Sequence, residues 1–166
     1  DSCGMSSSLS SSGKSCKAAS EPQLSDHVRS AADGAYPNAF RAEKISEKNI
    51  QVLLDEKDYE GNTDVQIRII TAEDLSIRTG SIYVKPKVDE GRIVPDIEND
   101  ILKIVVYSRY GNGRPQCAFI HGFGMKEGAI ASTIAHDSHN IVALGTNDHD
   151  IVAGINRLIE LKGGMI

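Results

Sequence analysis

The chain has no tryptophan, and aromatic residues make up only 5% of its 166 residues. It also has no apolar run that approaches the roughly 18 residues of a membrane-spanning helix. Basic residues do not exceed acidic ones, and the formal net charge is −5. A nucleic-acid-binding protein usually has a basic stripe or stacking aromatic side chains. We therefore expect an aliphatic core, no membrane partner and no nucleic-acid partner.

Cysteines are few and widely spaced, at Cys3, Cys16 and Cys117. An odd number without tight spacing predicts neither a disulfide framework nor a zinc knuckle. Reduced cysteines are typical of the cytoplasm, which is the expected location of the protein. Residues 1–20 contain no apolar segment of the kind that secretory signals need.

Residues 1–35 differ in composition from the rest, because nine of the first twenty residues are serine. Few apolar side chains accompany them, so burial cannot offset the entropy lost on ordering. We expect a disordered, Ser-rich leader or tail. A targeting peptide is the alternative, although Glu21 and Asp26 interrupt its basic character early. The remaining residues, 36–166, have the length and the apolar content of one domain.

Within residues 36–166, alternating or continuous apolar runs predict strands, and one segment predicts a helix. The expected strands are 50–54, 64–70, 80–85, 100–107, 116–121 and 141–145, with 129–135 either a strand or a short helix. Residues 86–99 are rich in proline, glycine and charge, which indicates a loop. The predicted fold class is α+β, with a mixed or antiparallel sheet and at least one covering helix.

The covering helix is expected over residues 148–162. Asn147 and its two neighbours are N-cap candidates, and Gly163 suits the position after the helix. Four aliphatic residues fall on one helical stripe that would pack on the sheet: Ile151, Ile155, Leu158 and Ile159.

The densest polar cluster of the chain lies between apolar segments, from Ser132 to Asn140. It contains His136, Asp137, His139 and Asn140, and burying such groups without partners costs a few kcal/mol each. Two histidines three apart can converge on one ligand, a carboxylate can orient an imidazole, and a carboxamide can read a purine edge. The alternative is a loop whose side chains only bond to backbone. A metal site is not expected from this chain alone, since structural and catalytic sites need three or four ligands.

Weaker candidates lie outside that cluster. His121 ends a predicted strand and precedes Gly122, where either a ligand contact or an ordinary turn would fit. Arg109 follows another predicted strand and could bind a carboxylate, or lie on the surface. Ser132 supplies a hydroxyl at the start of the cluster.

Four segments of the sequence resemble the C-terminal domain of adenine deaminases, which belong to the amidohydrolase superfamily. The segments are Asp100 to Arg109, Phe119 to Ser132, His136 to Asn140, and Arg157 to Gly164. The resemblance is specific over residues 100–164 and weaker over residues 38–99. It implies a hydrolase of purine metabolism that converts adenine to hypoxanthine and ammonia.

The resemblance also implies that the catalytic machinery lies elsewhere. The family's divalent metal, manganese or iron, is held by a TIM-type barrel, which needs roughly 200 residues or more. Neither that barrel nor its metal ligands are expected in this chain. Its partners would be the missing barrel, on the same or a neighbouring chain, and adenine in the complete enzyme.

On this interpretation, residues 36–166 form an accessory domain, truncated at its C-terminus, that caps or supports the barrel and is inactive alone. The residues expected to face the substrate, or to support groups that do, are His136, Asp137, His139 and Asn140. Three alternatives remain open: a structural module, a homo-oligomerisation module, and a free-standing purine-binding domain.

Overall fold

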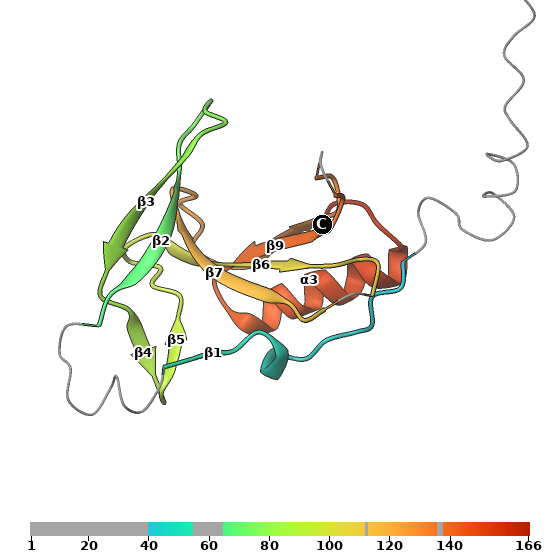
Figure 1. Ribbon diagram of the computed structural model, residues 1–166, viewed down its shortest axis with the longest axis horizontal. Coiled ribbons are helices and arrows are strands. Elements are labelled where there is room, and N and C mark those ends of the chain that lie inside the picture. The colour runs from blue at the N-terminus through green and yellow to red at the C-terminus, as the bar shows by residue number, and fades with distance from the viewer. Residues whose placement is uncertain (1–39, 55–64, 112, 136–137) are drawn as a thin grey trace, which may run out of the picture. The chain divides into compact units, whose positions relative to one another are not determined.

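The computed structural model describes residues 40–54, 65–111, 113–135 and 138–166 (Figure 1). The leader predicted over residues 1–35 lies outside the described residues. The described elements, in chain order, are η1 (Glu47–Asn49), β1 (Val52–Leu53), β2 (Ile67–Ala72), β3 (Thr79–Val84), β4 (Lys87–Asp89), β5 (Arg92–Val94), β6 (Ile101–Tyr107), β7 (Gln116–His121), β8 (Ala129–Ser132), β9 (Ile141–Gly145) and α3 (Asp148–Leu161).

A six-stranded sheet with the order β3-β2-β7-β6-β9-β8 forms the centre of the fold. All its neighbouring strands are antiparallel except β2 and β7, which pair in parallel through Ile70 with Ile120 and Thr71 with His121. The mixed sheet and its covering helix confirm the predicted α+β class. No closed barrel is formed by the residues that the structure describes.

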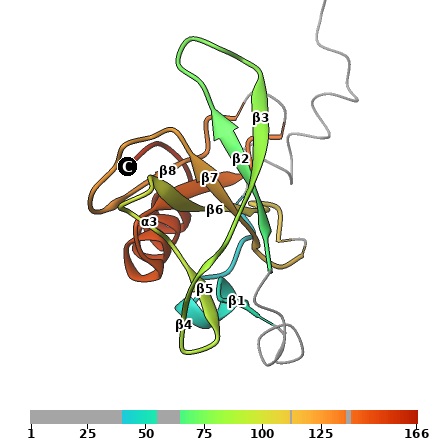
Figure 2. The same ribbon diagram turned by 90° about the vertical axis from the view of Figure 1, so that its left-hand side faces the viewer.

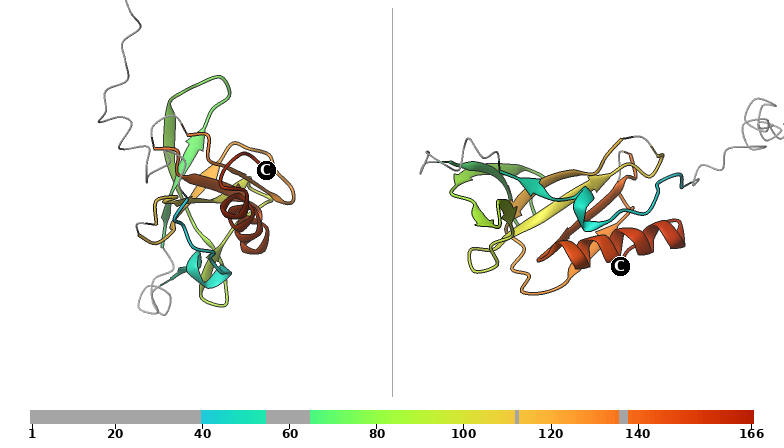
Figure 3. Two further views of the ribbon diagram at one scale, coloured as in Figure 1. Left: turned by 90° about the vertical axis from the view of Figure 1, so that its right-hand side faces the viewer. Right: turned by 90° about the horizontal axis from the view of Figure 1, so that it is seen from below.

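One face of this sheet packs against α3, as the views from two further sides show (Figures 2 and 3). Side chains alternate between the faces of a strand, so every second residue of β6 and β9 points toward the helix. Val105 and Ala143 join Ile151, Ile155 and Leu158 in one buried cluster. The aliphatic stripe predicted for the helix is therefore its buried face, with Ile159 packed at the margin.

Local sequence chemistry sets both ends of α3. The Asn147 side chain accepts a hydrogen bond from the Asp150 amide at 2.8 Å, which satisfies one of the free N–H groups of the first turn. At the other end Lys162 adopts a left-handed conformation, and the Gly163 amide bonds to the Leu158 carbonyl. The helix ends at Leu161, one residue before the predicted limit.

The loop predicted over residues 86–99 is wrong over residues 87–94, because β4 and β5 lie there and form a separate three-stranded sheet with β1. Glu90 and Gly91 join the two strands, and both have positive φ, as a tight hairpin turn requires. Ile93 then packs against Ile69 and Phe119 of the large sheet. Strands of three residues are too short for a periodic pattern to reveal.

Among the described residues, α3 is the longest helix, and neither it nor η1 has the length and apolar content to cross a membrane.

Candidate functional site

Sheet pairing brings several of the predicted site residues to one end of the large sheet. Tyr107 of β6 lies opposite Ile141 of β9, so the turn after β6 runs beside the loop that precedes β9. A hydrogen bond joins them directly, from the Tyr110 hydroxyl to the Ser138 carbonyl at 3.1 Å. Arg109, Ser132, His139 and Asn140 therefore share this end, which we call the loop end.

Arg109 is buried, with 6% of its surface exposed, so the surface position, one of the two alternatives left open by the sequence, is wrong. Its guanidinium lies 5.0 Å from the centre of the Phe40 ring and 5.4 Å from that of Tyr110. Such contacts between a cation and a ring face are attractive, and more so when they are shielded from water. The Arg109 carbonyl also accepts hydrogen bonds from the amides of Arg41 and Ala42. Arg109 thus holds residues 40–42 against the loop end.

His139 is exposed and has a φ of 51°, which side-chain-bearing residues rarely adopt. Its amide donates to the Ala135 carbonyl at 3.0 Å, closing a turn. The next residue, Asn140, behaves differently: its Oδ1 is enclosed, and no donor among the described residues reaches it. Solvent and any docked molecule therefore meet the His139 side chain first.

The remaining predicted residues contribute differently. His136 and Asp137 lie outside the described residues. The Ser132 hydroxyl accepts from the Ile134 amide at 2.9 Å, so it stabilises the local turn. His121 pairs with Ile101 at the start of β6, which places it at the opposite end of the sheet from Arg109. In the part of the chain that the structure describes, no three His, Cys, Asp or Glu residues are placed to hold a metal ion.

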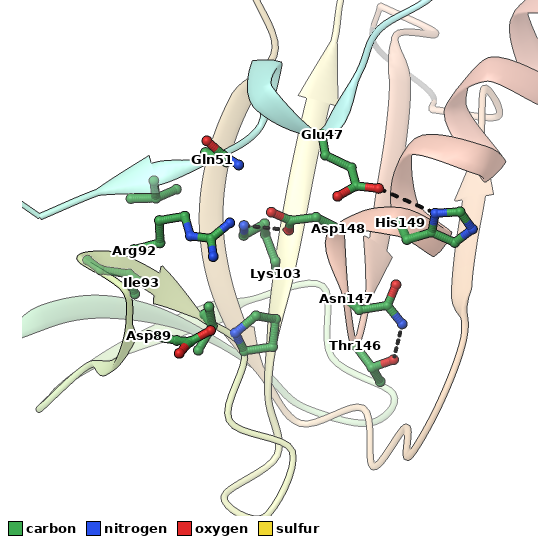
Figure 4. A pocket seen from close by; sticks show the side chains of 13 residues that line it. Glu47, Gln51, Asp89, Arg92, Ile93, Lys103, Thr146, Asn147, Asp148 and His149 are labelled. Carbon is green, nitrogen blue, oxygen red and sulfur yellow. Dashed lines mark hydrogen bonds and ion pairs between the residues drawn. The ribbon is translucent and has the colours of Figure 1, made fainter.

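A pocket of about 300 Å³ lies at the junction of the two sheets and α3, and the sequence analysis did not anticipate it (Figure 4). Its walls come from η1, β1, β4, β5, β6 and the first turn of α3. Lys103 and Asp148 meet inside it, with the Lys103 Nζ 2.5 Å from the Asp148 Oδ1. Lys103 is only 1% exposed and also donates to the Ile50 carbonyl at 3.2 Å.

The sequence did contain a signal for this ion pair. Lys103 interrupts the otherwise apolar run from Ile101 to Tyr107, and a charge inside a core strand needs a buried partner. The partner, Asp148, is 45 residues away, so spacing could not identify it.

Two further contacts between polar groups lie at or beside the pocket. His149 and Glu47 approach to 3.3 Å at its rim, and Arg92 binds Glu90 at 2.7 Å. Cys117 lies nearby with its Sγ 3.4 Å from the Ile50 carbonyl, and burial raises the pKa of its thiol despite the opposing charge of Lys103. The thiol therefore stays protonated near neutral pH and is a poor nucleophile. The Lys103–Asp148 ion pair at this pocket joins β6 to the start of α3.

Comparison with known proteins adds an independent observation. The family model described as the adenine deaminase C-terminal domain matches residues 76–166. An adenine deaminase of Methanosarcina barkeri is 44% identical over 129 residues, which are 78% of this chain and 23% of that protein. One from Methanosarcina acetivorans is 54% identical over 101 residues, covering 61% of this chain and 18% of that protein.

A bacterial relative gives the same picture. The adenine deaminase of Thermosipho melanesiensis is 45% identical over 105 residues, which are 63% of this chain and 18% of that protein. The chain therefore spans less than a quarter of the length of these curated relatives.

Proposed function

Since this chain belongs to the adenine deaminase C-terminal domain family, we propose that it is the accessory domain of an enzyme that hydrolyses adenine to hypoxanthine and ammonia. Its task is to cap and support a catalytic barrel that lies outside these 166 residues. The relatives' name supports the reaction, and the small share of their length that this chain matches supports placing the chemistry in the rest of the enzyme.

The observation that carries the proposal for the site is the exposed His139 on a turn held by hydrogen bonds. Its turn is closed by the Ala135 carbonyl, and the Tyr110 hydroxyl binds the preceding residue, Ser138. An exposed side chain whose backbone is hydrogen-bonded to neighbouring segments is well placed to contact a bound molecule. We assign His139 the substrate-facing role, together with the neighbouring His136 and Asp137 of the same loop.

Asn140 takes a supporting role in this proposal. Its enclosed Oδ1 faces no donor among the described residues, and an unsatisfied buried acceptor costs about 1–3 kcal/mol. A modest rearrangement of the loop upon contact with the catalytic barrel would give this oxygen a donor and remove that cost.

The described residues do not fit a metal site, because no three suitable side chains converge. We place the divalent metal of the family, manganese or iron, in the barrel. When bound there, it activates the water that attacks the purine ring. This chain contributes walls and hydrogen-bonding groups around the substrate.

The purified 166-residue chain is expected to release no ammonia from adenine. The described residues offer no metal-ligand set, and a barrel of eight βα units exceeds the length of the chain. An ammonia assay with added manganese or iron measures this directly. Turnover that copurifies with the chain and disappears in a His139→Ala variant would contradict the proposal.

His139→Ala is expected to lower kcat/KM for adenine about tenfold or more in an adenine deaminase that contains this domain, because one hydrogen bond to the substrate is lost. The melting temperature should not change, since the side chain is exposed. His149→Ala is the matched control, because His149 is also exposed but lies at the pocket rim. Unchanged kcat/KM in both variants would contradict a substrate-facing His139.

A further inference from the structure

The face of the large sheet opposite α3 is apolar across four neighbouring strands. The strand register aligns Ala118, Ile104, Leu144 and Ile130 in one row across the sheet. The adjacent row contains Gln116, Val106, Val142 and Ser132, so its two central positions are apolar as well. We call these two rows the open face.

Only one end of this side of the sheet is covered by described residues. Ile97 and Met125, from two loops, pack against Leu102, Ile120 and Leu144. Beyond them the side chains become accessible: Val106 is 39% exposed and Ile130 is 40% exposed. The single long helix of the described residues lies on the other side, beneath the sheet in Figure 3 (right).

The distribution of polar residues is the reverse of that expected for a face in contact with water. An antiparallel sheet with one solvated face normally alternates apolar inward and polar outward side chains. In β6 the only charged residue, Lys103, points to the covered side, where it needs an ion pair. The outward positions are Leu102, Ile104 and Val106. Strands that are apolar on both sides are typical of sheets covered on both faces.

We infer that the open face is the surface by which this domain docks onto the rest of the adenine deaminase chain. This inference rests on the proposed function and specifies the contact surface. The occupant is an apolar patch of the catalytic part of the enzyme, which lies in the remaining three quarters or more of the relatives' length. Contacts between domains of one chain usually bury about 600–1,500 Å².

The loop end continues directly from this surface. Ser132 is the last residue of both β8 and the second row, and it leads to Ile134, which is 70% exposed. The same loop ends in His139 and Asn140. Docking through the open face would therefore bring the loop end to the catalytic part. The sheet face would form the contact, and the polar loop would be positioned by it.

The test uses a full-length adenine deaminase that contains this domain. In the double variant Val106→Glu with Ile130→Glu, two carboxylates would have to be desolvated on docking, which is unfavourable. The domain should separate from the rest of the enzyme, with a larger radius of gyration in X-ray scattering. Limited proteolysis between the two parts should be at least tenfold faster. Leu161→Glu is the control, since Leu161 is 54% exposed at the end of α3.

A milder pair of substitutions keeps the inference testable if the double Glu variant misfolds. Val106→Thr with Ile130→Thr retains β-branched side chains, which suit a strand, and should give a smaller increase in the proteolysis rate. Wild-type scattering and proteolysis in the double Glu variant would overturn the inference. So would a change from dimer to monomer with unchanged proteolysis between the two parts, since the occupant would then be a second copy.

The outcomes separate this inference from the proposed function. If the Glu variant undocks while His139→Ala retains full activity, the docking surface stands and the substrate-facing role of His139 fails. If His139→Ala lowers kcat/KM while the Glu variant remains docked, the open face fails and the proposed function stands.

Discussion

Replacing Asp148 by asparagine is expected to lower the free energy of unfolding by about 3 kcal/mol or more, because it leaves the Lys103 ammonium buried without a counter-charge. The Ile50 carbonyl and the new carboxamide oxygen could still accept hydrogen bonds from it, but neither oxygen has a negative charge. Chemical denaturation of the wild-type and variant chains measures the difference. The loss is large compared with the total stability of a small domain, typically about 5–15 kcal/mol.

Replacing the other member of the ion pair, Lys103, should lower the free energy of unfolding by less than replacing Asp148 does. In Lys103→Met the Asp148 carboxylate is 23% exposed and lies in the first helical turn, where the helix dipole favours negative charge. We expect a loss of about 1–2 kcal/mol. Asp150→Asn is the matched control, since Asp150 lies in the same turn and binds only Asn147 through its side chain. Equal losses in Asp148→Asn and Asp150→Asn would contradict the argument.

Gly122→Ala is expected to destabilise the domain by about 3 kcal/mol, through backbone strain and steric conflict together. The φ of Gly122 is 110°, which alanine rarely adopts. A Cβ at this position would also clash with the carbonyl oxygen of Ala72 at the end of β2. Relief of that clash would have to move backbone, because the conflicting atom belongs to the main chain.

Gly124→Ala provides the comparison within the same loop. Gly124 also has a positive φ, of 64°, but a Cβ there meets no atom within 4 Å. Both amides donate to the Asp100 carboxylate, at 3.0 and 2.7 Å, so the two positions share their hydrogen-bonding environment. We expect a loss of about 1 kcal/mol for Gly124→Ala. A loss as large as that of Gly122→Ala would show that the Ala72 contact is unimportant.

The parts of the fold that could be predicted are those with long periodic patterns. The apolar run of β6 and the helical stripe through Ile151 and Ile155 each exceed the length at which a pattern becomes specific. The hairpin of β4 and β5 was missed because three-residue strands contain no periodicity. Its one visible sign was Glu90-Gly91, a pair whose positive φ angles closed the turn.

The site was predictable only where neighbours in space are close in sequence. His139 and Asn140 share a loop, and that cluster was evident from composition. The proximity of Arg109 to this loop depends on the pairing of Tyr107 with Ile141, which no local pattern determines. The partner of Lys103 was hidden for the same reason. The position of His121 was equally hidden, since a strand end followed by glycine does not reveal at which end of the sheet the residue lies.

The parallel pairing of β2 with β7 affects the order in which the domain can assemble. The strands β6, β7, β8 and β9 and the helix α3 all lie within residues 101–161, so short loops connect them. The β2–β3 hairpin joins this group through only two paired positions, Ile70 and Thr71. Closing long loops slows folding, because chain entropy is lost before the contacts form. We therefore expect the C-terminal half to fold first and to serve as the template onto which the hairpin is added.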